Sequence, residues 1–373
     1  MRISRTLAVS VAGEIALYAG IGFGGFVVVM LAQNLAQRLP ALVAVGFSWS
    51  DVLALVRGLM PLVAAYSVPV GFLFGVLAAV ARLAADAELV AMRACGLGLG
   101  AVLGPALALA VLVSLCTGLL MVHGEPAARR EIRALLTEVA SRGGLLEPGR
   151  FRAIGPRVVY VQARTRDNGL RRILVADRSD ARRPFLVFAE RGRFAFDPAT
   201  TTIHLQLEHG DVHFETGEPD EHQRIVFERF DYAIDASAVF ERGGGTRPRE
   251  MTFAELREAV AAADQGRLPP ESAGGRDPND FRAQYHRRLA LPFAPIVFAG
   301  LGVALGARRT RSARSWGFLA CAVLIAAYYT LLTFGEFLGE SGRVPSVLAL
   351  WIPNAAFALA TALLLWREHR GFA

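Results

Sequence analysis

Six apolar stretches, each long enough to cross a membrane, constrain the fold of this 373-residue chain more than any other feature. A helix needs about 20 apolar residues to cross the hydrocarbon core of a bilayer. Three stretches precede a charge-rich middle and three follow it: residues 15–35, 59–81, 97–122, 289–307, 316–338 and 346–366. The sequence therefore predicts a membrane protein with six transmembrane α-helices, arranged 3+3 around one inserted domain.

The same pattern predicts the domain boundaries. We expect the first three membrane helices in residues 1–123, the inserted domain in 124–287 and the last three helices in 288–373. A mean hydropathy of +0.38 is unusual for a soluble protein of this length. The first stretch exceeds the 7–15 apolar residues of a signal peptide, which favours a retained helix.

Arginine placement predicts the orientation of the spans. If the spans alternate in direction, one side of the membrane receives ten arginines: Arg2, Arg5, Arg82, Arg93, Arg308, Arg309, Arg311, Arg314, Arg367 and Arg370. The short loops and helix ends of the other side receive Arg38, Arg57, Arg288 and Arg343. Because cytoplasmic loops carry the excess of positive charge, we expect both termini in the cytoplasm and the insert outside it.

The net charge of +7 belongs to the membrane part, because the insert carries 26 arginines and 26 acidic residues. The basic charge therefore reflects membrane topology and gives no support to nucleic-acid binding. The three cysteines fall in or beside the apolar stretches, at Cys95, Cys116 and Cys321. The insert has none, so it must be held together by a hydrophobic core rather than by disulfides.

Short strands dominate the insert. Alternating or apolar runs occur at 157–162, 172–176, 184–188, 193–196, 202–207 and 224–227, and turn residues separate them at 167–169, 197–198 and 209–211. This spacing predicts a β-sandwich or open barrel, whose edge strands could pair with another protein. A short helix should follow, capped by Thr252 and Glu255. His204, His209 and His213 lie near Glu208, but on alternating strands they need not converge, and no metal site is expected.

Missing motifs exclude several functions. The chain contains no lysine, and a Walker A loop needs one on the nucleotide phosphates. The chain therefore cannot be a conventional P-loop ATPase, and another subunit must hydrolyse any ATP that drives it. The hydrolase motifs H-E-x-x-H and G-x-S-x-G are also absent. We expect a protein that is not an enzyme and has no cofactor.

The segment 84–96, between the second and third stretches, is too polar to cross a membrane and too apolar for an ordinary loop. Helical spacing places Leu89, Met92 and Gly96 on one stripe, and Asp86 and Glu88 lie at its start. A short cytoplasmic helix of this kind could dock on a partner. It could equally be an interfacial helix that joins two spans.

Motifs in this order resemble those of the LptF/LptG permeases, the YjgP/YjgQ family. The segment 86–96, residues 285–295 at the start of the fourth span, Tyr328-Tyr329 in the fifth, and 351–354 in the sixth carry the resemblance, which covers nearly the whole chain. The Ala-Cys-Gly ending at Gly96 and the Pro-Gly-Arg-Phe segment 148–151 resemble the F-type subunit more than the G-type.

The resemblance implies a permease subunit of an ABC-type exporter, which extracts lipopolysaccharide from the bacterial inner membrane. It implies a cytoplasmic ABC ATPase dimer, a second LptF/LptG-type permease, and a periplasmic bridge of LptC-like and LptA-like jellyroll proteins as partners. The insert would be a periplasmic β-jellyroll-like domain. The segment 84–96 would be the coupling helix, with Asp86, Glu88, Leu89, Met92 and Arg93 facing or supporting the ATPase contact.

Three residues near the outer end of the first span are candidates for binding lipid: Gln33, Asn34 and Arg38. An arginine there could bind phosphate bidentately, or could simply extend its charged end to the interface. Glu14 and Glu336 are acids near membrane depth and are candidate functional residues for that reason.

Other functions remain open from the residues alone. The chain could be a permease subunit of a different ABC system, or a membrane enzyme of unfamiliar type. It could also be a membrane-anchored receptor or assembly factor without transport, which would need no ATPase and would tolerate loss of Glu88.

Overall fold

The computed structural model describes residues 5–44, 49–139, 148–154, 156–165, 169–180, 184–197, 202–215, 222–235, 248–266, 277–307 and 313–370. The chain forms two compact units. The first is a helical bundle built from residues 1–33, 58–129 and 248–373. The second contains residues 34–57 and 130–247, and its main element is a β-sheet. Each unit is described separately below.

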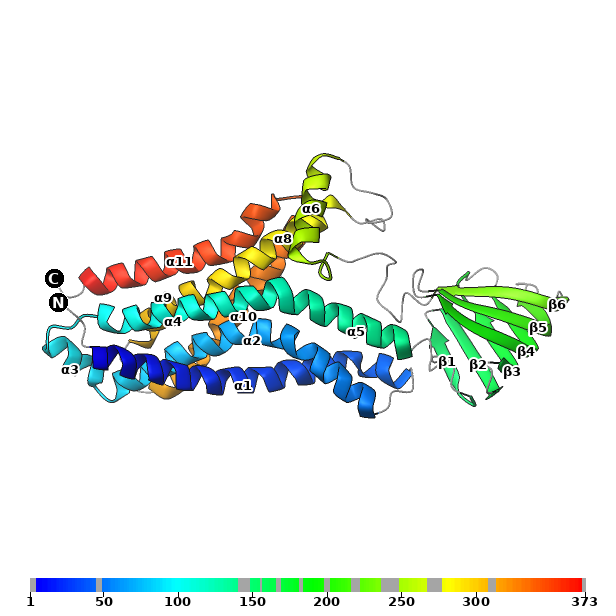
Figure 1. The fold of residues 1–373 in the computed structure, drawn as a ribbon, viewed down its shortest axis with the longest axis horizontal. Helices are drawn as coiled ribbons and strands as arrows, with labels where there is room; N and C mark the ends of the chain where they lie inside the picture. The colour runs from blue at the N-terminus through cyan, green and yellow to red at the C-terminus, as the bar shows by residue number, and fades with distance from the viewer. Residues whose placement is uncertain are drawn as a thin grey trace. The chain divides into compact units, whose positions relative to one another are not determined.

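The helices follow one another along the chain in Figure 1. Two irregular turns join consecutive helices: the π-helical turn η1 (Leu120–Gly124) joins α4 to α5, and the 3-10 turn η3 (Leu291–Phe293) joins α8 to α9. The helices are α1 (Arg5–Ala44), α2 (Trp49–Ala85), α3 (Glu88–Ala94), α4 (Gly100–Leu119), α5 (Glu125–Val139), α6 (Phe253–Asp264), α8 (Pro278–Ala290), α9 (Ala294–Gly306), α10 (Ala313–Glu340) and α11 (Ser346–Arg370).

Six helical segments of the described chain are long and apolar enough to cross a membrane, as the sequence predicted. Three come before the sheet and three after it: Arg5–Gln37, Trp49–Ala85, Gly100–Leu135, Pro278–Gly306, Leu319–Glu340 and Ser346–Arg367. The third extends well past Val122, where the apolar stretch ends, because the charged helix α5 continues it. The six apolar helices and a separate antiparallel sheet together define the architecture.

Glycines bring some of these helices unusually close. A Cβ atom placed on Gly75 of α2 would lie 2.6 Å from the backbone of Ala19 in α1, and Gly71 packs equally closely against Phe23. Gly302 and Gly306 of α9 pack closely against the side chains of Val76 and Val80 in α2. Close packing through small residues is the usual way in which membrane helices associate. Gly96, which follows α3, and Gly100, at the start of α4, make no such contact among the described residues, since neither has an atom within 4 Å of an added Cβ.

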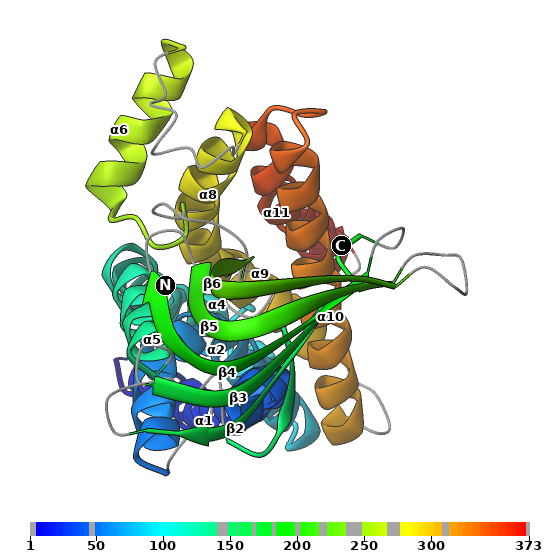
Figure 2. The ribbon, with the colours of Figure 1, turned by 90° about the vertical axis from the view of Figure 1, so that its right-hand side faces the viewer.

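The six described strands form one antiparallel sheet in which each strand pairs with the next. The described connections are therefore those of a meander. Figure 1 labels all six, and Figure 2 shows β2 to β6 from the side of the sheet. The strands are β1 (Phe151–Ile154), β2 (Arg157–Arg164), β3 (Gly169–Asp177), β4 (Phe185–Asp197), β5 (Thr202–Glu215) and β6 (His222–Asp235).

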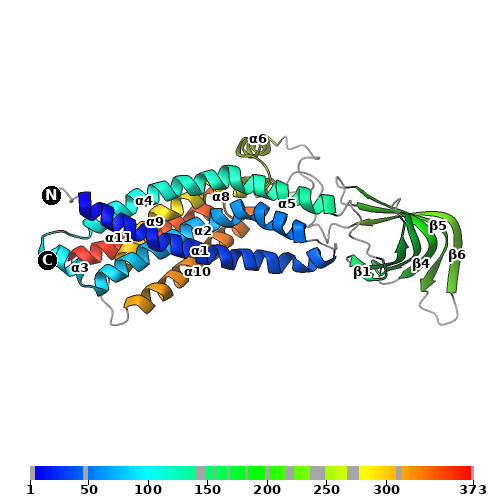
Figure 3. The ribbon, with the colours of Figure 1, turned by 60° about the horizontal axis from the view of Figure 1, so that its bottom comes forward.

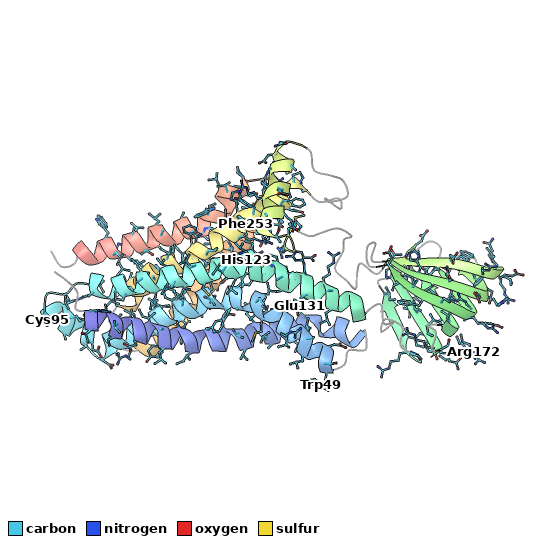
Figure 4. The ribbon with its side chains drawn as sticks, viewed as in Figure 1. Trp49, Cys95, His123, Glu131, Arg172 and Phe253 are labelled. Atoms are coloured by element: carbon cyan, nitrogen blue, oxygen red, sulfur yellow. The ribbon has the colours of Figure 1, made fainter. Side chains whose placement is uncertain are left out.

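A crease crosses the sheet. The pairing of strands β2 to β6 keeps one register throughout, yet it is interrupted at a single column of residues: Gln162, Arg172, Glu190, His209 and Glu228. Two members of this column have a left-handed backbone, Arg172 with φ 51° and His209 with φ 53°. Figure 4 labels Arg172 on the sheet, and Figure 3 shows the strands bending.

The crease reverses which residues point to the buried face. Strand β4 buries Val187 and Ala189 before the crease but Phe194 after it, so the alternation shifts by one residue. Strand β5 likewise buries Leu205 and Leu207 before the crease and Val212 after it. Because alternate residues of a strand point to opposite faces, this shift keeps one face of the sheet apolar along its whole length.

The prediction of a turn at residues 209–211 was wrong. These residues lie inside β5, where the crease produces the local break in alternation that resembles a turn. The runs 184–188 and 193–196, read as separate in the sequence, fall almost entirely within one strand, β4, which begins at Phe185 and crosses the crease. The predicted turns at 167–169 and 197–198 lie partly outside the described residues. The capping box of α6 is confirmed, because Thr252 and Glu255 each accept a hydrogen bond from the other's backbone N–H.

Asp177 anchors the end of β3 and is 5% exposed. Burial alone would raise its pKa, but hydrogen bonds from Ser179, Tyr232 and Arg157 outweigh burial and lower the pKa to about 2. The carboxylate therefore contributes stability that is present above about pH 4 and is lost as the pH falls towards 2. A depression of this size corresponds to about 2 kcal/mol.

We expect the Asp177→Asn variant to weaken the sheet much more at pH 5 than at pH 2. Pepsin cleavage of the full chain in detergent would measure this, with fragments assigned by mass spectrometry. The variant should be cleaved faster than the wild type within β2 and β3 at pH 5. The two rates should approach each other at pH 2, where about half of the wild-type carboxylate is protonated and most of its contribution to stability is lost. A rate ratio that does not change with pH would contradict the pKa argument.

Candidate functional site

The short helix α3 lies at the end of the bundle where α1 begins and α11 ends (Figures 1 and 3). A turn at Asp86 and Ala87 separates it from α2, and Ala87 has a left-handed backbone with φ 58°. Gly96 ends the helix with φ 77°, and the Leu97 N–H donates to the Met92 carbonyl at 2.9 Å. This closing hydrogen bond around a left-handed glycine is a Schellman motif, and Figure 4 labels Cys95 beside it.

One face of α3 packs on the bundle and the other is exposed. Leu89 is 6% exposed and belongs to the core between α2, α4 and α9, and Met92 packs against the same core. Asp86 and Glu88 are exposed, Arg93 is half-buried, and Val90 is 49% exposed. Of the five predicted coupling residues, Leu89 and Met92 therefore hold the helix against the bundle. The charged groups of the other three are accessible to solvent.

Arg82, near the end of α2, contacts three carboxylates around α3. Its guanidinium donates hydrogen bonds to Glu14 at 2.9 Å, to Asp86 at 3.1 Å and to Glu88 at 3.4 Å. Glu14 comes from α1, and its side chain is 15% exposed. The acid at membrane depth in the first span is therefore part of this cluster, a role that its sequence position alone did not reveal.

An open groove lies between α1 and α10 and has a volume of about 710 Å³. Its lining is apolar and aromatic with two threonines: Phe26 and Met30 from α1, and Ile325, Ala326, Tyr329, Thr330, Thr333, Phe334 and Phe337 from α10. A long apolar groove with few polar groups suits a hydrocarbon chain, because each CH₂ removed from water contributes about 0.8 kcal/mol.

A network of buried charges adjoins this groove. The Tyr329 hydroxyl donates to the Tyr66 carbonyl at 3.2 Å, and Arg287 lies over the Tyr66 ring at 5.4 Å. Arg287 is 5% exposed, and its guanidinium lies 3.7 Å from both Glu125 and Glu336. Glu336, an acid near membrane depth, thus has partners from distant parts of the chain.

The network continues outward from these acids. Arg129 donates to Glu125 at 2.8 Å, and Arg249 donates to Glu336 at 2.7 Å. Beside them, Arg288 is 1% exposed and donates to the carbonyls of Met251, Pro248 and Arg249. Phe253, labelled in Figure 4, stacks on Tyr285 and packs α6 against α8. These contacts tie the segment before α6 to the bundle.

The three candidate lipid-binding residues all belong to α1. Gln33 is exposed and lies on the helical face of Phe26 and Met30, being seven and three residues beyond them. Asn34 is half-buried. Arg38 is part of α1, but its side chain lies outside the described residues. Gln33 therefore continues the face of α1 that carries Phe26 and Met30, the two residues of that helix that line the groove.

The histidines of the sheet do not form a metal site among the described residues, where no group of three potential ligands occurs. His204 is exposed on β5, and the ring of His213 contacts the Asp211 carboxylate.

Comparison with known proteins covers nearly the whole chain. Residues 11–367 match the family described as lipopolysaccharide export system permease LptF/LptG. The chain is also similar to the lipopolysaccharide export system permease protein LptF of Escherichia coli K12, with 22% identity over 354 residues, which cover 91% of this chain and 88% of that protein. LptF of Shigella flexneri gives the same values. The chain therefore belongs to the LptF/LptG family of lipopolysaccharide export permeases.

Proposed function

We propose that this chain is the F-type permease subunit of an ATP-driven exporter, which extracts lipopolysaccharide from the bacterial inner membrane and passes it to a periplasmic bridge. The observation that carries the proposal is the combination of an apolar groove on α1 and α10 with an exposed acidic helix at one end of the same bundle. The family match, which covers residues 11–367, gives the lipid its identity.

The proposed orientation places α3 in the cytoplasm. The helix lies at the end of the bundle where α1 begins and α11 ends (Figure 1). Arg5, Arg82, Arg93 and Arg367 lie in helices that begin or end there, which agrees with the excess of positive charge in cytoplasmic loops. Three spans precede the sheet and three follow it in the chain, so the sheet domain would be periplasmic and both termini cytoplasmic.

We propose α3 as the coupling helix that binds one subunit of a cytoplasmic ABC ATPase dimer. Asp86 and Glu88 would face basic groups of the ATPase, since their carboxylates are exposed, and Arg93 would border the same contact. Leu89 and Met92 would transmit force, because both pack into the bundle core. A partner must hydrolyse the ATP, because the chain lacks the lysine of a Walker A loop.

The lipid's acyl chains would lie in the groove between α1 and α10. Gln33, Asn34 and Arg38 would meet the polar head of the lipid beyond it, since Gln33 continues the groove's face. A second LptF/LptG-type permease would close the cavity from the other side. ATP-driven movement of α3 would then narrow the cavity and push the lipid outward.

The sheet would receive the lipid and pass it on as a jellyroll-like domain. This role is supported by the apolar face of the sheet, which the crease keeps continuous along the strands. Among the described strands, β6 pairs only with β5, which leaves a 14-residue edge. Ile225 and Val226 on that edge are 47% and 72% exposed. An edge of this kind can add a strand from an LptC-like or LptA-like jellyroll protein.

Co-purification tests the proposal most directly. The tagged chain, extracted in mild detergent, should bring with it a P-loop ATPase and a second six-span permease, both identified by mass spectrometry. The Glu88→Ala variant should lose most of the ATPase while it keeps the second permease, because only the first contact depends on α3. The Glu131→Ala variant is the matched control, because Glu131 is an exposed acid elsewhere, on α5.

The opposite result would favour a membrane-anchored receptor or assembly factor. That function predicts no ATPase in several detergents and normal growth of cells that carry Glu88→Ala.

A further inference from the structure

We propose that Arg82 is the positioning residue that joins α3 to the paired helices α1 and α2, so that movement of α3 reaches the wall of the groove. The inference rests on the proposed function, because it concerns how an ATPase at α3 would act on the lipid. Its first support is that the guanidinium of Arg82, on α2, contacts Glu14 on α1 as well as Asp86 just before α3 and Glu88 at its start.

The residue type matters for this contact. Arginine presents five N–H donors in a planar fork, whereas lysine presents one compact charge on a flexible stem. The guanidinium of Arg82 uses Nη1 for Asp86, Nη2 for Glu88, and both Nε and Nη2 for Glu14. A lysine could not hold the same three carboxylates in fixed directions.

Of the three carboxylates bound to Arg82, Glu88 is the one that could most readily exchange Arg82 for a cation of the partner. Its hydrogen bond to Arg82 is the longest of the three at 3.4 Å, and its side chain is 48% exposed, against 15% for Glu14. If a cation of the ATPase bound Glu88, Arg82 would still be paired with Glu14 and Asp86. The exchange therefore avoids leaving an unpaired charge, which would be costly in a partly buried site.

Arg82 is also attached to the groove through two closely packed helices. It extends from α2 and binds Glu14 on α1, and the glycines Gly71 and Gly75 hold the two helices in backbone contact. The helix α1 then continues without interruption from Glu14 to Met30, about 24 Å at 1.5 Å per residue. Met30 lines the groove, so a tilt of α1 and α2 would move one wall relative to α10.

The inference can be tested in the complex of this chain with its co-purified ATPase and second permease, reconstituted in lipid. Spin labels at Met30→Cys and Phe334→Cys, on opposite walls of the groove, report its width after Cys95, Cys116 and Cys321 are replaced. The distance between the labels is measured without nucleotide and with ATP and vanadate. Wild-type Arg82 should give a nucleotide-dependent shift.

The Arg82→Gln variant should lose that shift while it retains the ATPase, since Glu88 stays available to the partner. The Arg82→Lys variant should give a smaller shift than the wild type, because it keeps the charge without the fork. Arg57→Gln, which removes an arginine whose side chain is 79% exposed, should leave the shift unchanged. A full shift in Arg82→Gln, or an equal loss in Arg57→Gln, would overturn the inference.

A second variant covers the case in which Arg82→Gln does not fold. Glu14→Gln leaves Arg82 bound to Asp86 and Glu88 but weakens its link to α1, so the nucleotide-dependent shift should again be reduced. An undiminished shift would show that Arg82 does not connect α3 to α1. Failure of the proposed function would look different, because the wild-type chain would then bring no ATPase or show no shift with nucleotide.

Discussion

Replacing Arg287 with methionine is expected to destabilise the helical bundle by about 3 kcal/mol. Arg287 is 5% exposed and lies 3.7 Å from both Glu125 and Glu336. Removal of one partner from a buried ion pair costs about 3–5 kcal/mol, because it leaves a charge without compensation. The low end applies here because each acid keeps a second arginine, Arg129 for Glu125 and Arg249 for Glu336.

Thermal unfolding of the detergent-solubilised chain would measure this effect, with Arg57→Ala as the matched control. The Arg57 and Glu131 side chains are 79% and 52% exposed, and an exposed ion pair contributes about 0–1 kcal/mol. We therefore expect Arg287→Met to unfold at a clearly lower temperature than the wild type, and Arg57→Ala to unfold close to it. Equal unfolding temperatures for the two variants would show that Arg287 is not paired in a buried site.

The sequence predicted the helices well because crossing a membrane requires a simple property, an apolar run of about 20 residues. It predicted their ends poorly because a helix can continue beyond its apolar run into charged residues. The helix that begins at Gly100 continues as α5, whose residues are charged enough to hide it from an apolar pattern. Its first residue, Glu125, is fully buried, which only the packing of distant helices can explain.

The sheet shows a different limit of sequence patterns. Alternation predicts a strand only while its phase is constant, and the crease shifts that phase in the middle of the long strands. Each half of β4 was recognisable, but the two halves looked like separate strands with opposite phase. The left-handed His209 is followed by Gly210 and Asp211, a combination that is more frequent in turns.

The candidate site could be predicted only in part. Helical spacing placed Leu89 and Met92 on one stripe, and the structure packs both against the bundle. The partner of Glu88 within the chain was not predictable, because Arg82 is one of many arginines and its choice of acids depends on how α1 meets α2. The groove was equally hidden, since α1 and α10 are separated by nearly the whole chain.

Gly75→Leu is expected to separate α1 from α2 and to destabilise the bundle by at least about 3 kcal/mol, the upper end for overpacking. The added Cβ alone would lie 2.6 Å from backbone atoms of both Ala19 and Ile15. A side chain can rotate away from a new neighbour, but backbone atoms move only if the whole helix moves. The helices would therefore have to part, which also opens the core around Ile15, a residue that is fully buried.

Gly24→Leu is the matched control, because a Cβ at Gly24 of α1 would have no atom within 4 Å. Leucine favours a helix over glycine by nearly 1 kcal/mol, so this variant should unfold at or slightly above the wild-type temperature. Thermal unfolding of both purified variants in the same detergent makes the comparison. If Gly75→Leu unfolded at the same temperature as Gly24→Leu, α1 and α2 would not be in backbone contact. The proposed connection from Arg82 to the groove would then lack the close helix packing on which it depends.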